Sequence, residues 1–184
     1  MFWINQARQL PNMPDMINGI CWLGLDRPAT NCLLPLYVGV TNLPHKLQTM
    51  NILEFSKDSA WWAFNFVANY ATIKYASMIQ DIVKVQEEME RHNSAKQQKM
   101  DIKAGELFLQ HKTEECHALL DEFNEEVVED TVVRWWKLSE QLIVKYNNNC
   151  ETTDAQNIMV HKADYPRWWL CNVGYLYGPI SYKQ

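Results

Sequence analysis

Residues 17–40 read INGICWLGLDRPATNCLLPLYVGV, and this stretch decides the β portion of the fold. It is apolar, β-branched and aromatic, with glycines and prolines as punctuation. These features predict two strands, around 18–25 and 30–40, joined by a charged turn at residues 26–28. Apolar side chains at nearly every position indicate strands that are covered on both faces. Because a two-stranded hairpin is marginal alone in water, further strands are expected from elsewhere.

A helical pattern follows the strands. Candidate N-caps are Ser56, Asp58 and Ser59, so a helix is predicted to begin near Ala60. Apolar residues then recur at steps of three and four, which places the following set on one face: Phe64, Val67, Ala71, Tyr75, Met78, Ile82, Val85 and Met89. Residues 91–101 turn polar, and helices are predicted again over 102–123 and 126–146.

The first and last of these helices, 60–90 and 126–146, are expected to pack together because both present an apolar face. The side chains predicted to be buried between them are Phe64, Tyr75, Met78, Trp135 and Leu142. In the tail, Asp164-Tyr165-Pro166 predicts the start of a short helix that carries Trp168 and Trp169. The expected organisation is α+β, with a β-rich part over 1–58, a helical region over 59–149 and a C-terminal tail over 150–184.

Composition excludes several classes of protein. The formal charge of −5, from 22 acidic and 17 basic residues, disfavours a surface that neutralises nucleic-acid phosphates. No apolar run approaches the roughly 18 to 20 residues that span a bilayer, and the start lacks the pattern of a signal peptide. Localisation stays unknown. Five cysteines without a CxxC pair favour reduced, mostly buried thiols.

Two clusters of reactive side chains have a simpler explanation. His111 and Glu115, four residues apart and followed by Cys116-His117, could point at a metal, but no third convergent ligand is visible. A solvated polar helix face accounts for them better, and no metal or other cofactor is predicted. Cys32 with His45 could suggest a nucleophile and its base, yet Cys32 lies in an apolar strand that would oppose thiol ionisation. A buried structural cysteine is the better interpretation.

The turn between the strands offers candidate substrate-binding residues. Asp26-Arg27 could present a guanidinium to a substrate carboxylate, although a solvated hairpin turn with Pro28 explains the same residues. Asn31 is a polar amide in an apolar strand, so if buried it requires a hydrogen-bond partner. It is either a site residue or a satisfied core amide. Asp26, Arg27 and Asn31 are therefore the candidate wall of a substrate cleft.

Several short motifs, taken in order, resemble one family, that of dipeptidase A and the secernins. The strand region contributes Gln6-Ala7-Arg8, Pro14, residues 19–26, Ala29-Thr30-Asn31-Cys32 and residues 35–40. The helical region contributes residues 59–69, Tyr75, Met78, Asp81 and Val85-Gln86, and the tail contributes residues 165–170. No single motif is as diagnostic as a metal signature, but their order and spacing cover most of the chain.

The resemblance implies an N-terminal-nucleophile hydrolase, a four-layer αββα sandwich. In this family a cysteine at the start of the mature chain attacks a peptide carbonyl, with its own α-amino group as the base. That nucleophile lies upstream of the matched region, and no residue here occupies its role. The resemblance therefore assigns no catalytic residue to this chain.

Two functions from different classes follow as hypotheses. The first is the C-terminal portion of a cysteine dipeptidase that hydrolyses short peptides. Apolar Phe2, Trp3 and Ile4 at the start suggest a cut in mid-domain, so the expected partners are the missing N-terminal part or further copies of the chain. The second is a non-catalytic helical module that binds a partner through acidic helices and tryptophans.

Overall fold

The computed structural model describes residues 2–8, 13–147, 151–152 and 167–172. The chain divides into two compact units, residues 1–140 and 141–184, which are described one at a time. The first unit contains a small antiparallel sheet and several helices, so the predicted α+β class is confirmed.

The sheet has three strands in the order β1-β2-β3. Strands β2 (Ile20–Leu25) and β3 (Leu34–Tyr37) are the predicted pair, although β3 is much shorter than the predicted 30–40. Cys21 lies opposite Leu36 in their antiparallel register. Strand β1 (Phe2–Arg8) pairs with the other side of β2, with a register shift between Ile4 and Gln6. The expectation that the predicted pair needs a further strand is therefore confirmed, and the start of the chain supplies it.

Side chains from the helices close the outer edge of β3. Asn124 accepts a hydrogen bond from the Tyr37 backbone N–H and donates one to its carbonyl, at 3.0 Å each, as a neighbouring strand would. Near the start of the strand, the Leu33 N–H donates to Glu90 Oε1 at 3.0 Å. Pro35 lies between them and has no N–H to donate. The outer edge of β3 is thus covered by side chains from two of the helices.

Two short helices and a 3-10 turn flank these strands. Helix α1 (Asp15–Asn18) precedes β2, η1 (Pro28–Thr30) lies between β2 and β3, and α2 (His45–Gln48) follows β3. Every residue of β3 is buried, as predicted, whereas Cys21, Trp22 and Leu23 of β2 are only partly buried. The prediction of strands covered on both faces is therefore confirmed for β3 only.

The predicted helix over 60–90 is two helices. Helix α3 (Ala60–Ala71) begins at Ser59, whose side chain accepts a hydrogen bond from the Trp62 N–H, and α4 (Tyr75–Leu109) follows after a break at residues 72–74. Thr72 Oγ1 donates to the Asn69 carbonyl, which closes the end of α3. Tyr75, the first residue of α4, is 48% exposed, while the other seven residues of the predicted apolar face are buried.

Helix α4 continues through the polar stretch 91–101, where a break was predicted. The polar side chains are accommodated because they find partners: Asn93 Nδ2 donates to Thr131 Oγ1 at 3.2 Å, and Gln97 Nε2 donates to Asp101 Oδ2 at 2.6 Å. The chain turns instead at residues 110–112, inside the predicted helix 102–123, with His111 at a φ of 58°.

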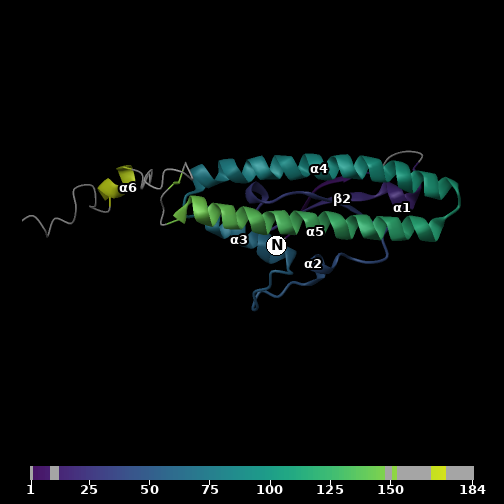
Figure 1. Ribbon diagram of the computed structural model, residues 1–184, viewed down its shortest axis with the longest axis horizontal. Coiled ribbons are helices and arrows are strands. Elements are labelled where there is room, and N and C mark those ends of the chain that lie inside the picture. The colour runs from purple at the N-terminus through teal and green to yellow at the C-terminus, as the bar shows by residue number, and fades with distance from the viewer. Residues whose placement is uncertain (1, 9–12, 148–150, 153–166, 173–184) are drawn as a thin grey trace, which may run out of the picture. The chain divides into compact units, whose positions relative to one another are not determined.

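Helix α5 (Thr113–Lys145) runs back along α4, as Figure 1 shows. Lys96 of α4 forms ion pairs of 2.8 Å with Glu126 and Asp130 of α5. The predicted packing of α3 against α5 is confirmed by Phe64 and Trp135, whose ring centroids are 5.1 Å apart. The predicted burial of Tyr75 in this contact is wrong.

The second unit contains the end of α5 and helix α6 (Arg167–Asn172), which is the short helix predicted in the tail. Trp168 in α6 is exposed and Trp169 is partly buried. The predicted cap at residues 164–166 lies outside the described residues. No helix in the described part of the chain is long and apolar enough to cross a bilayer.

Candidate functional site

The turn from β2 to η1 is where the structure concentrates unpaired polar atoms. Asp26 takes a φ of 64°, in the left-handed region that few residues other than glycine adopt. Aspartate is one of the residues that tolerate this conformation. Its Oδ2 atom is buried and has no hydrogen-bond partner among the described residues. A buried carboxylate oxygen without a donor is costly, so this atom is poised to accept a hydrogen bond.

Arg27 fixes the turn to the end of α3. Its Nη1 donates to the Ala68 carbonyl at 3.3 Å, and its Nη2 donates to Asn69 Oδ1 at 3.1 Å. Asn69 is in turn held by Asn65, to which its Nδ2 donates at 2.8 Å. A guanidinium carries five N–H donors, so these two contacts leave capacity for an anion. The Arg27 residue is exposed, as substrate contact would require.

Asn31 is completely buried and its amide is half satisfied. Nδ2 donates to the Leu25 carbonyl at 3.2 Å, which places the amide group beside the start of the turn. Its Oδ1 has no partner in the described structure, and neither has Oγ1 of the adjacent buried Thr30. The interpretation as a fully satisfied core amide therefore accounts for only half of this side chain.

Together, Asp26, Thr30 and Asn31 bring into six residues of chain three oxygen atoms that no group of the described residues pairs with. The Asp26 and Asn31 oxygens require N–H or O–H donors, which a peptide N–H, an ammonium group or water can supply, while the Thr30 hydroxyl can donate as well as accept. Thr30 was not among the predicted residues. Its sequence context, a threonine before an asparagine in an apolar run, does not indicate which oxygen atoms remain unpaired.

Cys32 follows this turn, and its thiol resists ionisation. The thiol is completely buried, and burial, reinforced by the negative charge of Glu90, raises its pKa far above the ordinary value. His45 lies on α2, where its ring Nε2 is 3.5 Å from Thr49 Oγ1 and its backbone N–H donates to Glu125. Cys32 is therefore the buried structural cysteine that its apolar surroundings predicted.

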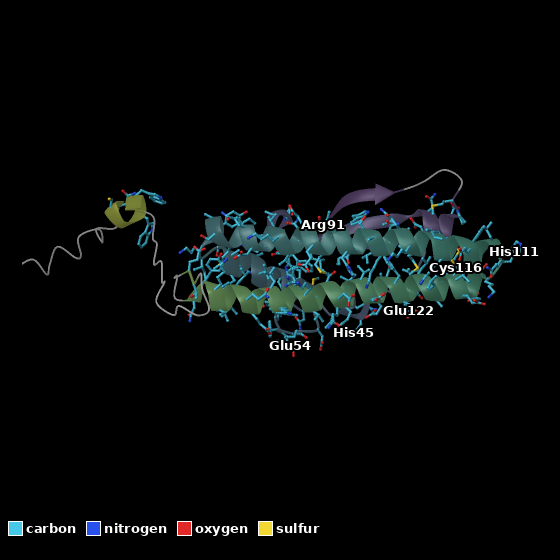
Figure 2. The ribbon with its side chains drawn as sticks, turned by 45° about the horizontal axis from the view of Figure 1, so that its top comes forward. His45, Glu54, Arg91, His111, Cys116 and Glu122 are labelled. Atoms are coloured by element: carbon cyan, nitrogen blue, oxygen red, sulfur yellow. The ribbon has the colours of Figure 1, made fainter. Side chains whose placement is uncertain are left out.

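The cluster at residues 111–117 has separate local partners. His111 and Glu115 were predicted to lie on one helix. His111 lies instead in the turn between α4 and α5, so the two residues do not share a helix face. Glu115 pairs with Lys112 at 3.0 Å, Cys116 Sγ donates to the Ala104 carbonyl, and His117 Nδ1 lies 3.0 Å from the Gly39 carbonyl. Figure 2 shows His111 and Cys116 at the end of the α4–α5 pair. No group of three candidate metal ligands occurs within the described ranges.

Asp121 anchors the chain after β3 to α5. Burial opposes its ionisation, but hydrogen bonds from the side chains and backbone N–H groups of Thr41 and Asn42 outweigh burial and lower its pKa. After the end of β3, the backbone N–H groups of Thr41 and Asn42 therefore donate to this carboxylate and not to a neighbouring strand. Its donors are all protein groups, so its role is structural.

Comparison with known protein families places this geometry in context. Residues 2–88 match the model of Peptidase family C69, which agrees with the resemblance to the dipeptidase A family. The matched range contains all three strands, the turn at residues 26–31, α3 and the beginning of α4. No curated protein matches the chain.

Proposed function

We propose that this chain, whose residues 2–88 carry the Peptidase family C69 domain, forms the C-terminal portion of a cysteine dipeptidase. The family match carries this proposal, because the family name gives the reaction class and the matched range includes the candidate turn. The substrates are short peptides. The strand part over 1–58 contributes to the sheet and the cleft wall, the helices over 59–149 cover it, and residues 150–184 form a tail.

The nucleophile of the proposed reaction is a cysteine at the mature N-terminus of a longer polypeptide that includes this chain. The thiols of the first unit support this assignment, because burial raises the pKa of Cys21, Cys32 and Cys116. A thiol nucleophile requires a lowered pKa or an adjacent base. The complete fold of the enzyme is then the four-layer αββα sandwich that the resemblance implies.

The turn at residues 26–31 forms part of the substrate wall in this proposal. Arg27, the exposed residue among the three, directs its remaining donors at a substrate carboxylate, and the buried polar groups of Asp26 and Asn31 form the wall behind it.

A dipeptide panel assayed with the purified 184-residue chain tests the assignment of the nucleophile. The expected result is no turnover above the uncatalysed rate, because the step that forms the covalent intermediate is missing. Turnover that persists through purification to homogeneity and is lost in Cys32→Ala would contradict the proposal, since the nucleophile would then lie in this chain.

A further inference from the structure

The segment after β3 exposes five large apolar side chains close together in the sequence. Leu53 is 92% exposed and Ile52 is 65% exposed. The others, each at least half exposed, are Leu43, Met50 and Phe55. We call these five residues the 43–55 surface. Large apolar side chains gathered in this way mark interaction sites more often than scattered ones do.

Two tryptophans hold the backbone of this segment in place. Trp62 Nε1 of α3 lies 3.0 Å from the Asn51 carbonyl and 2.9 Å from the Glu54 carbonyl, and donates to both. Trp136 Nε1 of α5 donates to the Lys57 carbonyl at 2.9 Å. The ring of Phe55 packs edge-on against both indoles, with centroid distances of 5.5 Å and 5.8 Å. The 43–55 surface is therefore preorganised, which lowers the entropic cost of binding.

The surroundings of the 43–55 surface are acidic. Segment 41–58 contains Glu54 and Asp58, and four carboxylates of α5 lie along it: Asp121, Glu122, Glu125 and Glu129. Figure 2 shows His45, Glu54 and Glu122 along one side of the helical pair.

Two lysines oppose these six carboxylates. Lys46 forms ion pairs with Asp58 and Glu129, at 3.4 Å and 3.3 Å, and its side chain is only 12% exposed. Lys57 lies over the ring of Trp136, 5.9 Å from its centroid. The charge offered to a partner around the apolar side chains is negative.

We infer that the 43–55 surface binds a protein segment in which apolar side chains are interspersed with lysine or arginine. Apolar contacts supply the affinity, and charge complementarity supplies orientation and association rate. The acidic surround opposes an anionic membrane, and it opposes a second copy of this chain because both faces would carry the same charge. This inference does not depend on the proposed peptidase activity.

Fluorescence anisotropy with two labelled peptides tests the inference. One is an amphipathic peptide of leucine and lysine about four helical turns long, and the other has glutamate in place of every lysine. We expect the lysine peptide to bind saturably to the 184-residue chain and to weaken as NaCl is raised, while the glutamate peptide does not bind. Ile52→Ser with Leu53→Ser should weaken binding about tenfold or more.

A matched variant separates this surface from exposed apolar side chains in general. Ile102→Ser with Leu109→Ser removes similar side chains, 65% and 80% exposed, from α4. This variant should bind the lysine peptide as the unmodified chain does. Equal weakening in both variants, or equal binding of the two peptides, would overturn the inference. Dimerisation or binding to phosphatidylserine vesicles that only the Ile52→Ser/Leu53→Ser variant loses would also overturn it, because the occupant would then be another copy or a membrane.

Discussion

At the scale of single residues, two buried asparagines in the same unit differ in how completely the protein satisfies their amide groups. Asn124 uses both its amide oxygen and its amide nitrogen on the Tyr37 backbone, whereas Asn31 uses only its nitrogen. Stability therefore explains Asn124 completely and Asn31 only in part.

This contrast gives a stability prediction. Asn124→Leu should lower the free energy of unfolding by about 2–4 kcal/mol, because two hydrogen bonds are lost and the Tyr37 backbone groups stay buried. Asn31→Leu should change it by less than about 1.5 kcal/mol, because one bond is lost and one unpaired oxygen is removed. Urea unfolding of the two variants measures the difference. An equal loss in both would mean that Asn31 is an ordinary core amide.

Asp121 gives a prediction about pH. Its pKa is lowered in the folded chain, so its contribution to stability is complete above the unfolded value of about 3.9. The contribution is lost as the pH falls through the lower folded pKa. Urea unfolding between about pH 2 and pH 6 should show a smaller loss of stability with acid for Asp121→Asn than for the unmodified chain.

The control for this experiment is Glu122→Gln. It removes the same charge one position along α5 and none of the bonds to Thr41 and Asn42. If both variants have the same acid dependence, the hydrogen bonds to residues 41–42 are not its cause.

At the scale of elements, the α3–α5 contact gives a prediction about packing. Phe64 is fully buried against Trp135, while Tyr75 is 48% exposed beyond the break between α3 and α4. Phe64→Ala should therefore cost about 3–5 kcal/mol, whereas Tyr75→Ala should cost less than about 1 kcal/mol. Thermal unfolding of both variants checks this. Comparable losses would support a continuous helix with all eight apolar residues on one buried face.

The element boundaries show what the sequence could and could not predict. The turn at residues 26–28, the two strands and a cap just before Ala60 are local signals, and the structure contains each of them, with β3 shorter than predicted. The breaks depend on tertiary partners. Asn93 stays within α4 because Thr131 accepts its hydrogen bond, and an isolated sequence contains no sign of that partner.

In the candidate turn, too, local signals were predictable from the sequence and features that depend on tertiary partners were not. Asp26, Arg27 and Asn31 were identified because charged and amide groups are conspicuous among apolar neighbours. The attachment of Arg27 to Asn69 joins residues 42 positions apart, and the unpaired oxygen of Thr30 depends on what surrounds it. Neither follows from local patterns.

At the scale of the whole molecule, we propose that the sheet continues at β1. Strand β3 is covered by Asn124 and Glu90, and β1 is the outer strand on the opposite side of the described sheet. Three residues of β2 are also only partly buried. A strand edge that no other strand of the described residues pairs with and a partly covered apolar sheet both favour association.

We therefore expect the isolated 184-residue chain to self-associate through the β1 edge. Sedimentation equilibrium at micromolar concentrations measures this. The Ile52→Ser/Leu53→Ser variant should associate to the same extent, since those residues lie on the 43–55 surface. A stable monomer without aggregation would mean that the core of the chain is complete.

Hydrolysis of dipeptides by the extended polypeptide tests the proposed enzyme most directly. The measurement requires the in-frame sequence upstream of residue 1, expressed together with this chain and processed to an N-terminal cysteine. We predict turnover that is abolished when that cysteine is replaced by alanine and retained in Cys32→Ala. An upstream sequence without such a cysteine, or an extended polypeptide that hydrolyses no dipeptide, would contradict the account and favour a partner-binding module.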